Sequence, residues 1–143
     1  MARLAFAFAL LILCLPARAN PVERVSRADA AEIRAVIYRQ IDAFKRDDAE
    51  GAFALVSPSV RQAFGTPDKF LDVVRMAYRP VYRASTVVFL EMLTMGEDVV
   101  QPIQVTDRAG LVWVAYYAMQ RQRDGSWRTN GCHLTQPVRS IPA

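Results

Sequence analysis

Cys132 and His133 are neighbours in the stretch SWRTNGCHLTQ (residues 126–136), and His133 is the only histidine of the chain. A thiol and an imidazole form a nucleophile–base pair only within hydrogen-bond reach of each other. The stretch has the composition of a β-strand, in which successive side chains point to opposite faces. We therefore expect Cys132 to be a buried, unreactive thiol and His133 to lie at the surface or rim.

Strict alternation along this strand would divide its residues between two faces. Trp127, Thr129, Gly131 and His133 would then share one face. The other face would carry Arg128, Asn130, Cys132 and Leu134. A bulge at Gly131 would disturb this pattern.

Glu91 is the carboxylate of greatest chemical interest, because it interrupts the apolar segment VVFLEML (residues 87–93). If Glu91 lined the concave side of a sheet, burial would raise its pKa and suit it to proton transfer or to binding a cation. The alternative is that Glu91 belongs to a partly exposed face with Val87, Phe89 and Leu93.

Aromatic residues form the second candidate set, since their polar tips favour half-buried sites. Together with Glu91, the predicted ligand-binding residues are Tyr78, Tyr82, Trp113 and Tyr117; Tyr116 is a further aromatic candidate. The alternative is ordinary packing between helices and sheet. Arg75, Arg79 and Arg83 recur every four residues, but Pro80 interrupts a helix there, so we expect a solvated basic rim.

Several classes of site are excluded by residue content. One cysteine and one histidine in the mature chain cannot supply the four ligands of a usual zinc site, so we expect no metal and no cofactor. The sequence has no phosphate-binding loop, nucleophile elbow or paired-carboxylate spacing. The net charge is +4, and both signs alternate along the chain, which argues against a nucleic-acid partner.

The N-terminus MARLAFAFALLILCLPARAN has the pattern of a secretory signal peptide, cleaved after Ala19. The alternative is a lipoprotein signal at Cys14, but Leu13 is not the small residue that such a signal requires. We therefore expect an exported bacterial protein, periplasmic or secreted, with no membrane association after cleavage. Cys132 would then be the only cysteine left, without a partner for an intramolecular disulfide.

The remaining chain changes its periodicity halfway. Residues 27–46 have an apolar stripe at helical spacing, and Ser26 with Asp29 resembles a capping box. Shorter helices are expected over residues 49–55, from Pro58 to Gly65 and from Pro67 to Tyr78. Residues 81–95, 98–107, 111–122 and 126–136 are then rich in β-branched and aromatic residues, with turn signals between the later segments.

This order predicts an α+β fold, in which N-terminal helices pack on a curved antiparallel sheet of about four strands. The predicted organisation is a signal peptide (1–19), a polar leader (20–26), one domain (27–138) and a tail (139–143). Pro102 should restrict its strand to an edge or a bulge. The segment Leu111–Met119 is apolar on both faces, so we expect helices to cover one face and either further helices or a partner, such as a second copy of the chain, to cover the other.

Three stretches carry a resemblance to a known family: QIDAFKRDDAEGAFALVSPSVRQAFG, YRPVYRASTVVFL and VWVAYYAMQRQRDGSWRTNGCHL. They are similar to an exported bacterial family catalogued as domain of unknown function 4864. The long first helix and the closing DGSWR strand also resemble the cone-shaped nuclear-transport-factor-two-like fold. The resemblance implies that the chain has this fold and is exported. It implies no reaction, cofactor or catalytic residue. Thr129 departs from it, because such closing strands usually carry an apolar residue there.

Three functions remain open. The leading hypothesis is a non-catalytic module that binds a small ligand or a protein. The first alternative is an enzyme of proton-transfer or hydrolytic type, with Glu91 as its acid or base. The second alternative is a structural homodimer that uses a sheet face.

Overall fold

Helices occupy the first half of the described chain and strands the second half. The computed structural model describes residues 25–95 and 98–135. The predicted signal peptide, residues 20–24 of the leader and the tail lie outside the described residues. The elements are α1 (Arg27–Lys45), α2 (Ala49–Phe53), α3 (Pro58–Phe64), α4 (Pro67–Ala77), α5 (Arg79–Tyr82), β1 (Thr86–Phe89), β2 (Leu93–Met95), β3 (Asp98–Thr106), β4 (Val112–Arg121) and β5 (Trp127–Leu134).

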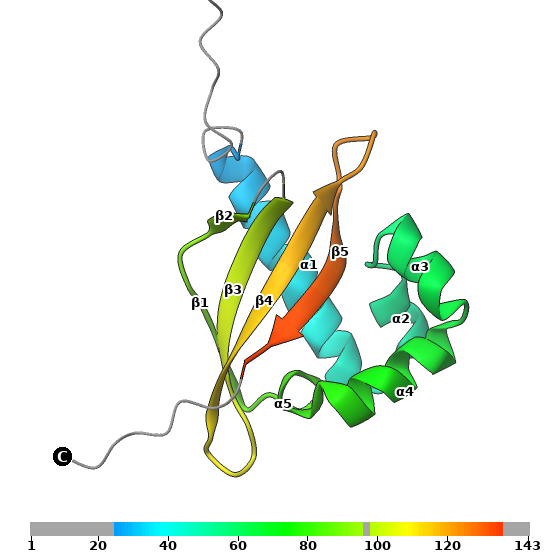
Figure 1. The fold of residues 1–143 in the computed structure, drawn as a ribbon, viewed down its shortest axis with the longest axis vertical. Helices are drawn as coiled ribbons and strands as arrows, with labels where there is room; N and C mark the ends of the chain where they lie inside the picture. The colour runs from blue at the N-terminus through cyan, green and yellow to red at the C-terminus, as the bar shows by residue number, and fades with distance from the viewer. Residues whose placement is uncertain (1–24, 96–97, 136–143) are drawn as a thin grey trace, which may run out of the picture.

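The long helix α1 forms where the apolar stripe predicts it (Figure 1). Ser26 Oγ accepts a hydrogen bond from Asp29 N at 3.0 Å, and Asp29 Oδ2 accepts one from Ser26 N at 3.2 Å, which completes the predicted capping box. Asp29 Oδ1 also accepts hydrogen bonds from the side chains of Arg121 and Trp127, which anchor the start of α1 to the β4–β5 hairpin. The stripe itself is buried and consists of Ile33, Val36, Ile37, Ile41 and Phe44.

The short helices begin at the caps that the sequence indicates. The side chains of Asp48, Ser57 and Thr66 accept hydrogen bonds from the first turns of α2, α3 and α4. A further short helix, α5, follows Tyr78, where the sequence analysis expected no helix. Pro80 fits there because the first turn of a helix leaves backbone N–H groups unpaired in any case.

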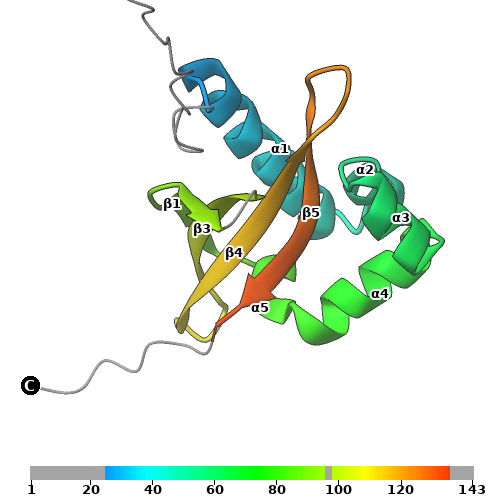
Figure 2. The same ribbon diagram turned by 45° about the horizontal axis from the view of Figure 1, so that its top comes forward.

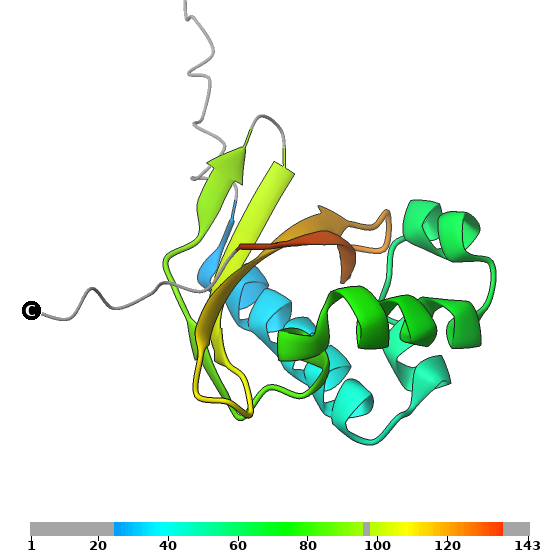
Figure 3. The ribbon, with the colours of Figure 1, turned by 60° about the horizontal axis from the view of Figure 1, so that its bottom comes forward.

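The sheet is antiparallel, with the order β1-β3-β4-β5, and β2 pairs with the far end of β3. Because β1 and β2 share one edge, the five strands occupy four positions, which agrees with the expected sheet of about four strands. The sheet is curved, and the described helices lie on one of its faces (Figures 2 and 3). We call this the inner face. The predicted α+β class is confirmed.

Pro102 lies in a central strand, so the expectation of an edge strand is wrong, but an irregularity of the bulge type does lie opposite it, because residues 90–92 face only Gln101 and Pro102. The edge strand breaks opposite Pro102, between Phe89 and Leu93, so the missing proline N–H has no regular partner to satisfy. Leu90 N still donates to Pro102 O at 3.0 Å. Gln101 Nε2 then donates to Leu90 O at 2.8 Å, in place of the N–H that proline lacks.

A β-bulge in β5 changes the direction of the side chains in its first half. Ala118 pairs with Gly131 and Met119 with Thr129, so Asn130 is an extra residue on β5. Gly131 has φ +143°, a conformation that glycine adopts easily. The expected alternation, which placed Trp127 and Thr129 on the side of His133, is therefore wrong. The inner face instead carries Trp127, Thr129, Cys132 and Leu134.

The break at Pro102 predicts that Gln101 has a large effect on stability. Gln101 is fully buried, and Gln101→Leu would leave Leu90 O without this donor. We expect the free energy of unfolding to fall by about 1–3 kcal/mol, measured by urea denaturation. Gln104→Leu, on the opposite face of the same strand, is the matched control. Equal stability of the two variants would contradict this account.

Candidate functional site

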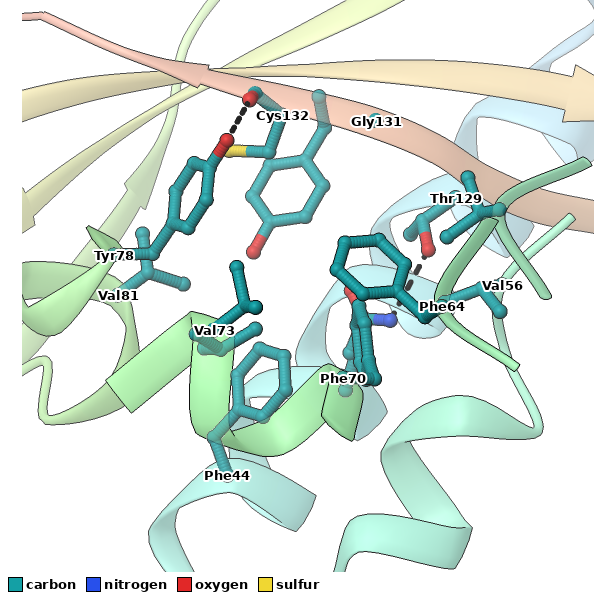
Figure 4. A pocket seen from close by; sticks show the side chains of 14 residues that line it. Phe44, Val56, Phe64, Phe70, Val73, Tyr78, Val81, Thr129, Gly131 and Cys132 are labelled. Atoms are coloured by element: carbon teal, nitrogen blue, oxygen red, sulfur yellow. Dashed lines mark hydrogen bonds between the residues drawn. The ribbon is translucent and has the colours of Figure 1, made fainter. Parts of the chain in front are cut away.

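An apolar cavity of about 110 Å³ lies between the helices and the inner face of β4 and β5 (Figure 4). Phe64, Phe70 and Val73 face Gly131 and Cys132 across it. Of the residues that line it, Gly131 is exposed, whereas Val60, Phe64 and Val73 are half-buried. Its lining residues are Gln40, Phe44, Val56, Val60, Phe64, Phe70, Val73, Val74, Tyr78, Val81, Tyr117, Thr129, Gly131 and Cys132.

Gln40 supplies the polar side of the cavity on α1. Its Nε2 atom donates to Ala52 O and to Thr129 Oγ1, both at 3.1 Å. Thr129 Oγ1 in turn donates to Leu55 O at 3.3 Å. These bonds explain why the closing strand carries threonine instead of an apolar residue, since the hydroxyl both accepts from Gln40 and donates to the α2–α3 connection.

The bulge fixes the strand side of the cavity. Asn130 Oδ1 accepts hydrogen bonds from Ser57 Oγ at 2.6 Å and Ser59 Oγ at 3.0 Å, which join the extra residue of β5 to the start of α3. Ser57 N donates to Thr129 O at 2.8 Å beside it. The connection between α2 and α3 therefore follows β5 closely, and Cys132 is turned toward the helices.

Cys132 and His133 lie on opposite faces of β5, as expected, and they form no dyad. Cys132 is half-buried, where a fully buried thiol was expected. The thiol lines the cavity, and burial raises the pKa of this thiol to about 12. Tyr78 Oη donates to the Cys132 carbonyl oxygen at 3.0 Å (Figure 4). His133 is exposed. A thiol that stays protonated at neutral pH is a weak nucleophile, so this arrangement favours packing and binding over covalent chemistry.

Tyr117 places a hydroxyl group at the cavity without a protein partner. The residue is 2% exposed, and among the described residues no group hydrogen-bonds to its Oη atom. Burial raises the pKa of the Tyr117 phenol well above its usual value, and Cys132 and Tyr78 add smaller contributions. Within the described residues, Gln101 Oε1 is the one fully buried side-chain polar atom without a partner, so the Tyr117 hydroxyl instead borders the space of the cavity, where water or a ligand atom can pair with it.

The structure separates the predicted ligand-binding residues. Tyr78 and Tyr117 line the cavity together. Tyr82 does not: its hydroxyl donates to Asp47 and accepts from Arg75 and Arg83.

Trp113 lines a different cleft, where its Nε1 atom donates to Asp107 Oδ2 at 3.0 Å. Tyr116 is half-buried on the outer face of β4, opposite His133 of β5.

Glu91 is exposed and lies in the break between β1 and β2, outside the cavity. The hypothesis that it lines the concave side of the sheet is therefore not supported, and Glu91 is exposed, as the alternative expected. The reason is Pro102: the edge strand cannot continue past the residue that lacks an N–H group, and the interrupted segment turns Glu91 toward solvent. The carboxylate thus lacks the burial on which its predicted role as acid or base depended.

Asp47 joins the end of α1 to α5 at a separate polar cluster. Its carboxylate accepts hydrogen bonds from Tyr82, Arg75 and Arg83, and these partners lower its pKa, with Tyr82 contributing most. Arg83 also donates to Phe44 O at 2.6 Å. The cluster holds α5 against α1, which places Tyr78 and Val81 at the cavity.

Gln40 and the phenylalanines of α3 and α4 line the cavity but were not predicted as site residues. A signal was present for Gln40, because it interrupts the apolar stripe between Ile37 and Phe44. The phenylalanines carry no such signal, since a cavity wall and a packed core use the same residues. Over residues 25–95 and 98–135, no three His, Cys, Asp or Glu side chains converge as metal ligands would.

A family model described as Domain of unknown function (DUF4864) matches residues 26–141. The chain belongs to the DUF4864 family. The match begins at the N-cap of α1 and extends past β5, so this DUF4864 domain contains every residue of the cavity. No curated protein matches the chain. The likeness to the nuclear-transport-factor-two-like cone stays a prediction, and the function has to be argued from the geometry.

The raised thiol pKa predicts slow labelling of Cys132 in the native domain. With a pKa of about 12, the thiolate fraction at pH 8 is about 10⁻⁴, against roughly a quarter for an unperturbed cysteine. We expect the rate of alkylation by iodoacetamide to be more than about 100-fold below that in urea, and to rise roughly tenfold per pH unit between pH 7 and 10. Peptide mapping separates Cys132 from Cys14. Fast, pH-independent labelling of Cys132 in the native protein would contradict the assignment.

Proposed function

We propose that this DUF4864 domain is a non-catalytic module that binds a small, mainly apolar molecule in the inner cavity. The observation that carries the proposal is Tyr117, which is 2% exposed and lines an apolar cavity with a hydroxyl that forms no hydrogen bond with the described residues. A ligand with one hydrogen-bonding atom would pair with this hydroxyl while its apolar body contacts the phenylalanines and valines.

The size of the cavity restricts the ligand. At about 110 Å³, it is smaller than the 300–1,000 Å³ of sites for drug-sized molecules. An engineered cavity of roughly 150 Å³ in another protein binds benzene, which sets the scale. Because about 110 Å³ is less than this, a single small ring, or the end of a longer chain, would fill the inner cavity and extend beyond it.

The ionisable groups of the cavity support binding over catalysis. The pKa values of Cys132, Tyr78 and Tyr117 are all raised, chiefly by burial. These three groups are therefore neutral at pH 7 and offer hydrogen bonds without charge. The enzymatic alternative relied on Glu91, whose exposure outside the cavity removes its support.

The proposal includes export. The supporting pattern is the short apolar run followed by Pro16 and the small-residue site ending at Ala19. No helix within the described residues is long and apolar enough to span a membrane. A cavity in an exported domain would take its ligand from the periplasm or the medium.

A homodimer is a second candidate, favoured by the outer face of the sheet. Val88 and Leu93 are 49% and 42% exposed there, and the half-buried Val114 and Tyr116 lie on the same face. Sedimentation velocity over a range of concentrations tests it. If the dimer forms through this face, Val88→Glu should raise its dissociation constant, whereas Glu50→Gln on α2 should not. A monomer at every concentration would remove this candidate.

The binding proposal predicts that Tyr117 distinguishes phenol from its isostere toluene. In each protein, the affinity for phenol is divided by the affinity for toluene. This ratio should be about twofold to tenfold higher in the wild type than in Tyr117→Phe, because one hydrogen bond contributes roughly 0.5–1.5 kcal/mol. Ligand-observed NMR measures both affinities. Tyr116→Phe, the neighbouring tyrosine on the opposite face, should keep the wild-type preference. Equal preference in the wild type and in Tyr117→Phe would refute the role of this hydroxyl.

A further inference from the structure

We propose that a second cavity, distinct from the inner one, binds an organic anion with a flat apolar body. This cavity, which we call the Trp113 cleft, has a volume of about 580 Å³ and lies between the α4–α5 corner, the β3–β4 turn and the end of β5. The β3–β4 turn lies beside α5 in Figures 1 and 2. The cleft is lined by Met76, Ala77, Arg79, Pro80, Arg83, Asp107, Arg108, Ala109, Trp113 and Leu134.

Two guanidinium groups of the cleft have no anionic partner in the described part of the chain. Arg79 on α5 and Arg108 in the β3–β4 turn are exposed, and neither forms a salt bridge or a side-chain hydrogen bond there. The contrast with Arg75 and Arg83 is direct, since both of these pair with Asp47. The predicted basic rim is thus divided: two of its arginines stabilise the fold, while Arg79 joins Arg108 at the cleft.

The acidic residue of the cleft is already satisfied. Asp107 Oδ1 accepts hydrogen bonds from Ala109 N and Leu111 N, both at 2.9 Å, and its Oδ2 accepts one from Trp113 Nε1. These donors lower the pKa of Asp107, with Trp113 contributing most. The carboxylate therefore organises the turn and the indole ring, and the lining as a whole keeps an excess of positive charge.

The remaining walls are apolar. Trp113 is half-buried and held by its bond to Asp107, so its ring is a fixed surface. Met76 is 81% exposed, an unusual position for a large apolar side chain, and Pro80 and Leu134 complete the lining. A flat apolar body suits the indole surface, and guanidinium groups pair with planar carboxylates or with phosphates.

The volume fits a molecule of this kind, since binding sites for small organic molecules measure about 300–1,000 Å³. Arginines from two separate segments, a fixed aromatic wall and an exposed methionine together indicate an anionic headgroup on an apolar body. The Trp113 cleft shares no lining residue with the inner cavity, so the two proposals stand or fall separately.

Benzoate and its neutral analogue benzamide test the cleft on the full chain by ¹H–¹⁵N NMR. The Trp113 indole N–H lies in the cleft, whereas the Trp127 indole N–H donates to Asp29 and serves as an internal control. We expect benzoate to shift the Trp113 signal in a saturable way and to leave that of Trp127 unchanged. Benzamide should bind several-fold more weakly, and added salt should weaken benzoate binding.

Charge-removing variants complete the test. Arg79→Gln and Arg108→Gln should each weaken benzoate binding roughly twofold to fivefold, as expected for exposed ion pairs. Arg123→Gln, an exposed arginine in the β4–β5 turn, is the matched control and should have no effect. Phenyl phosphate in place of benzoate shows which headgroup the cleft prefers, and tighter binding of either one supports the site. A non-saturable benzoate shift, equal binding of benzamide, or equal weakening by Arg123→Gln would overturn the proposal.

Discussion

The site of this DUF4864 domain depends on one extra residue in β5. Asn130 has no partner in β4, and this bulge lets Trp127 and Thr129 before it, and Cys132 after it, all face the helices. Without it, the alternation of a regular strand would turn either Thr129 or Cys132 outward. The extra residue is also held from outside the sheet, because its amide oxygen accepts hydrogen bonds from Ser57 and Ser59 at the start of α3.

Buried polar side chains stabilise each place where regular pairing fails. Gln101 supplies the donor that Pro102 lacks, and Gln40 connects α1 to the threonine before the bulge. Each glutamine side chain donates a hydrogen bond to a backbone or side-chain oxygen near the irregularity. Such donors are needed because a buried polar group without a partner lowers the stability of the fold. The compensation is incomplete at Gln101, whose Oε1 atom is buried and has no partner within the described chain. The Tyr117 hydroxyl also forms no hydrogen bond there, but it borders the inner cavity, where a ligand atom can reach it.

Two cavities lie around the corner between α4 and α5, and neighbouring residues serve different ones. Tyr78 lines the inner cavity, and Arg79 lines the Trp113 cleft. Their chemistry differs: the inner cavity is neutral and small, whereas the cleft is larger and positively charged. The cluster of Asp47, Arg83 and Tyr82 holds this corner against α1, so one set of ionic contacts positions both walls.

Local sequence patterns predicted α1 to α4 with their caps, the α+β class and the separation of Cys132 from His133, because periodicity, capping and alternation are local properties of the chain; α5 was not predicted. Ligand binding by Tyr78 and Tyr117 stays a prediction, although both line the inner cavity. Three features depend on tertiary contacts. They are the exposure of Glu91, the sheet face on which Trp127 and Thr129 lie, and the hydrogen-bond partners of Tyr82. Each depends on a residue distant in sequence: Pro102 breaks the strand that precedes it, Ser57 stabilises the bulge at Asn130, and Asp47 holds Tyr82. Such contacts leave no periodic pattern, so only the folded chain brings these residues together.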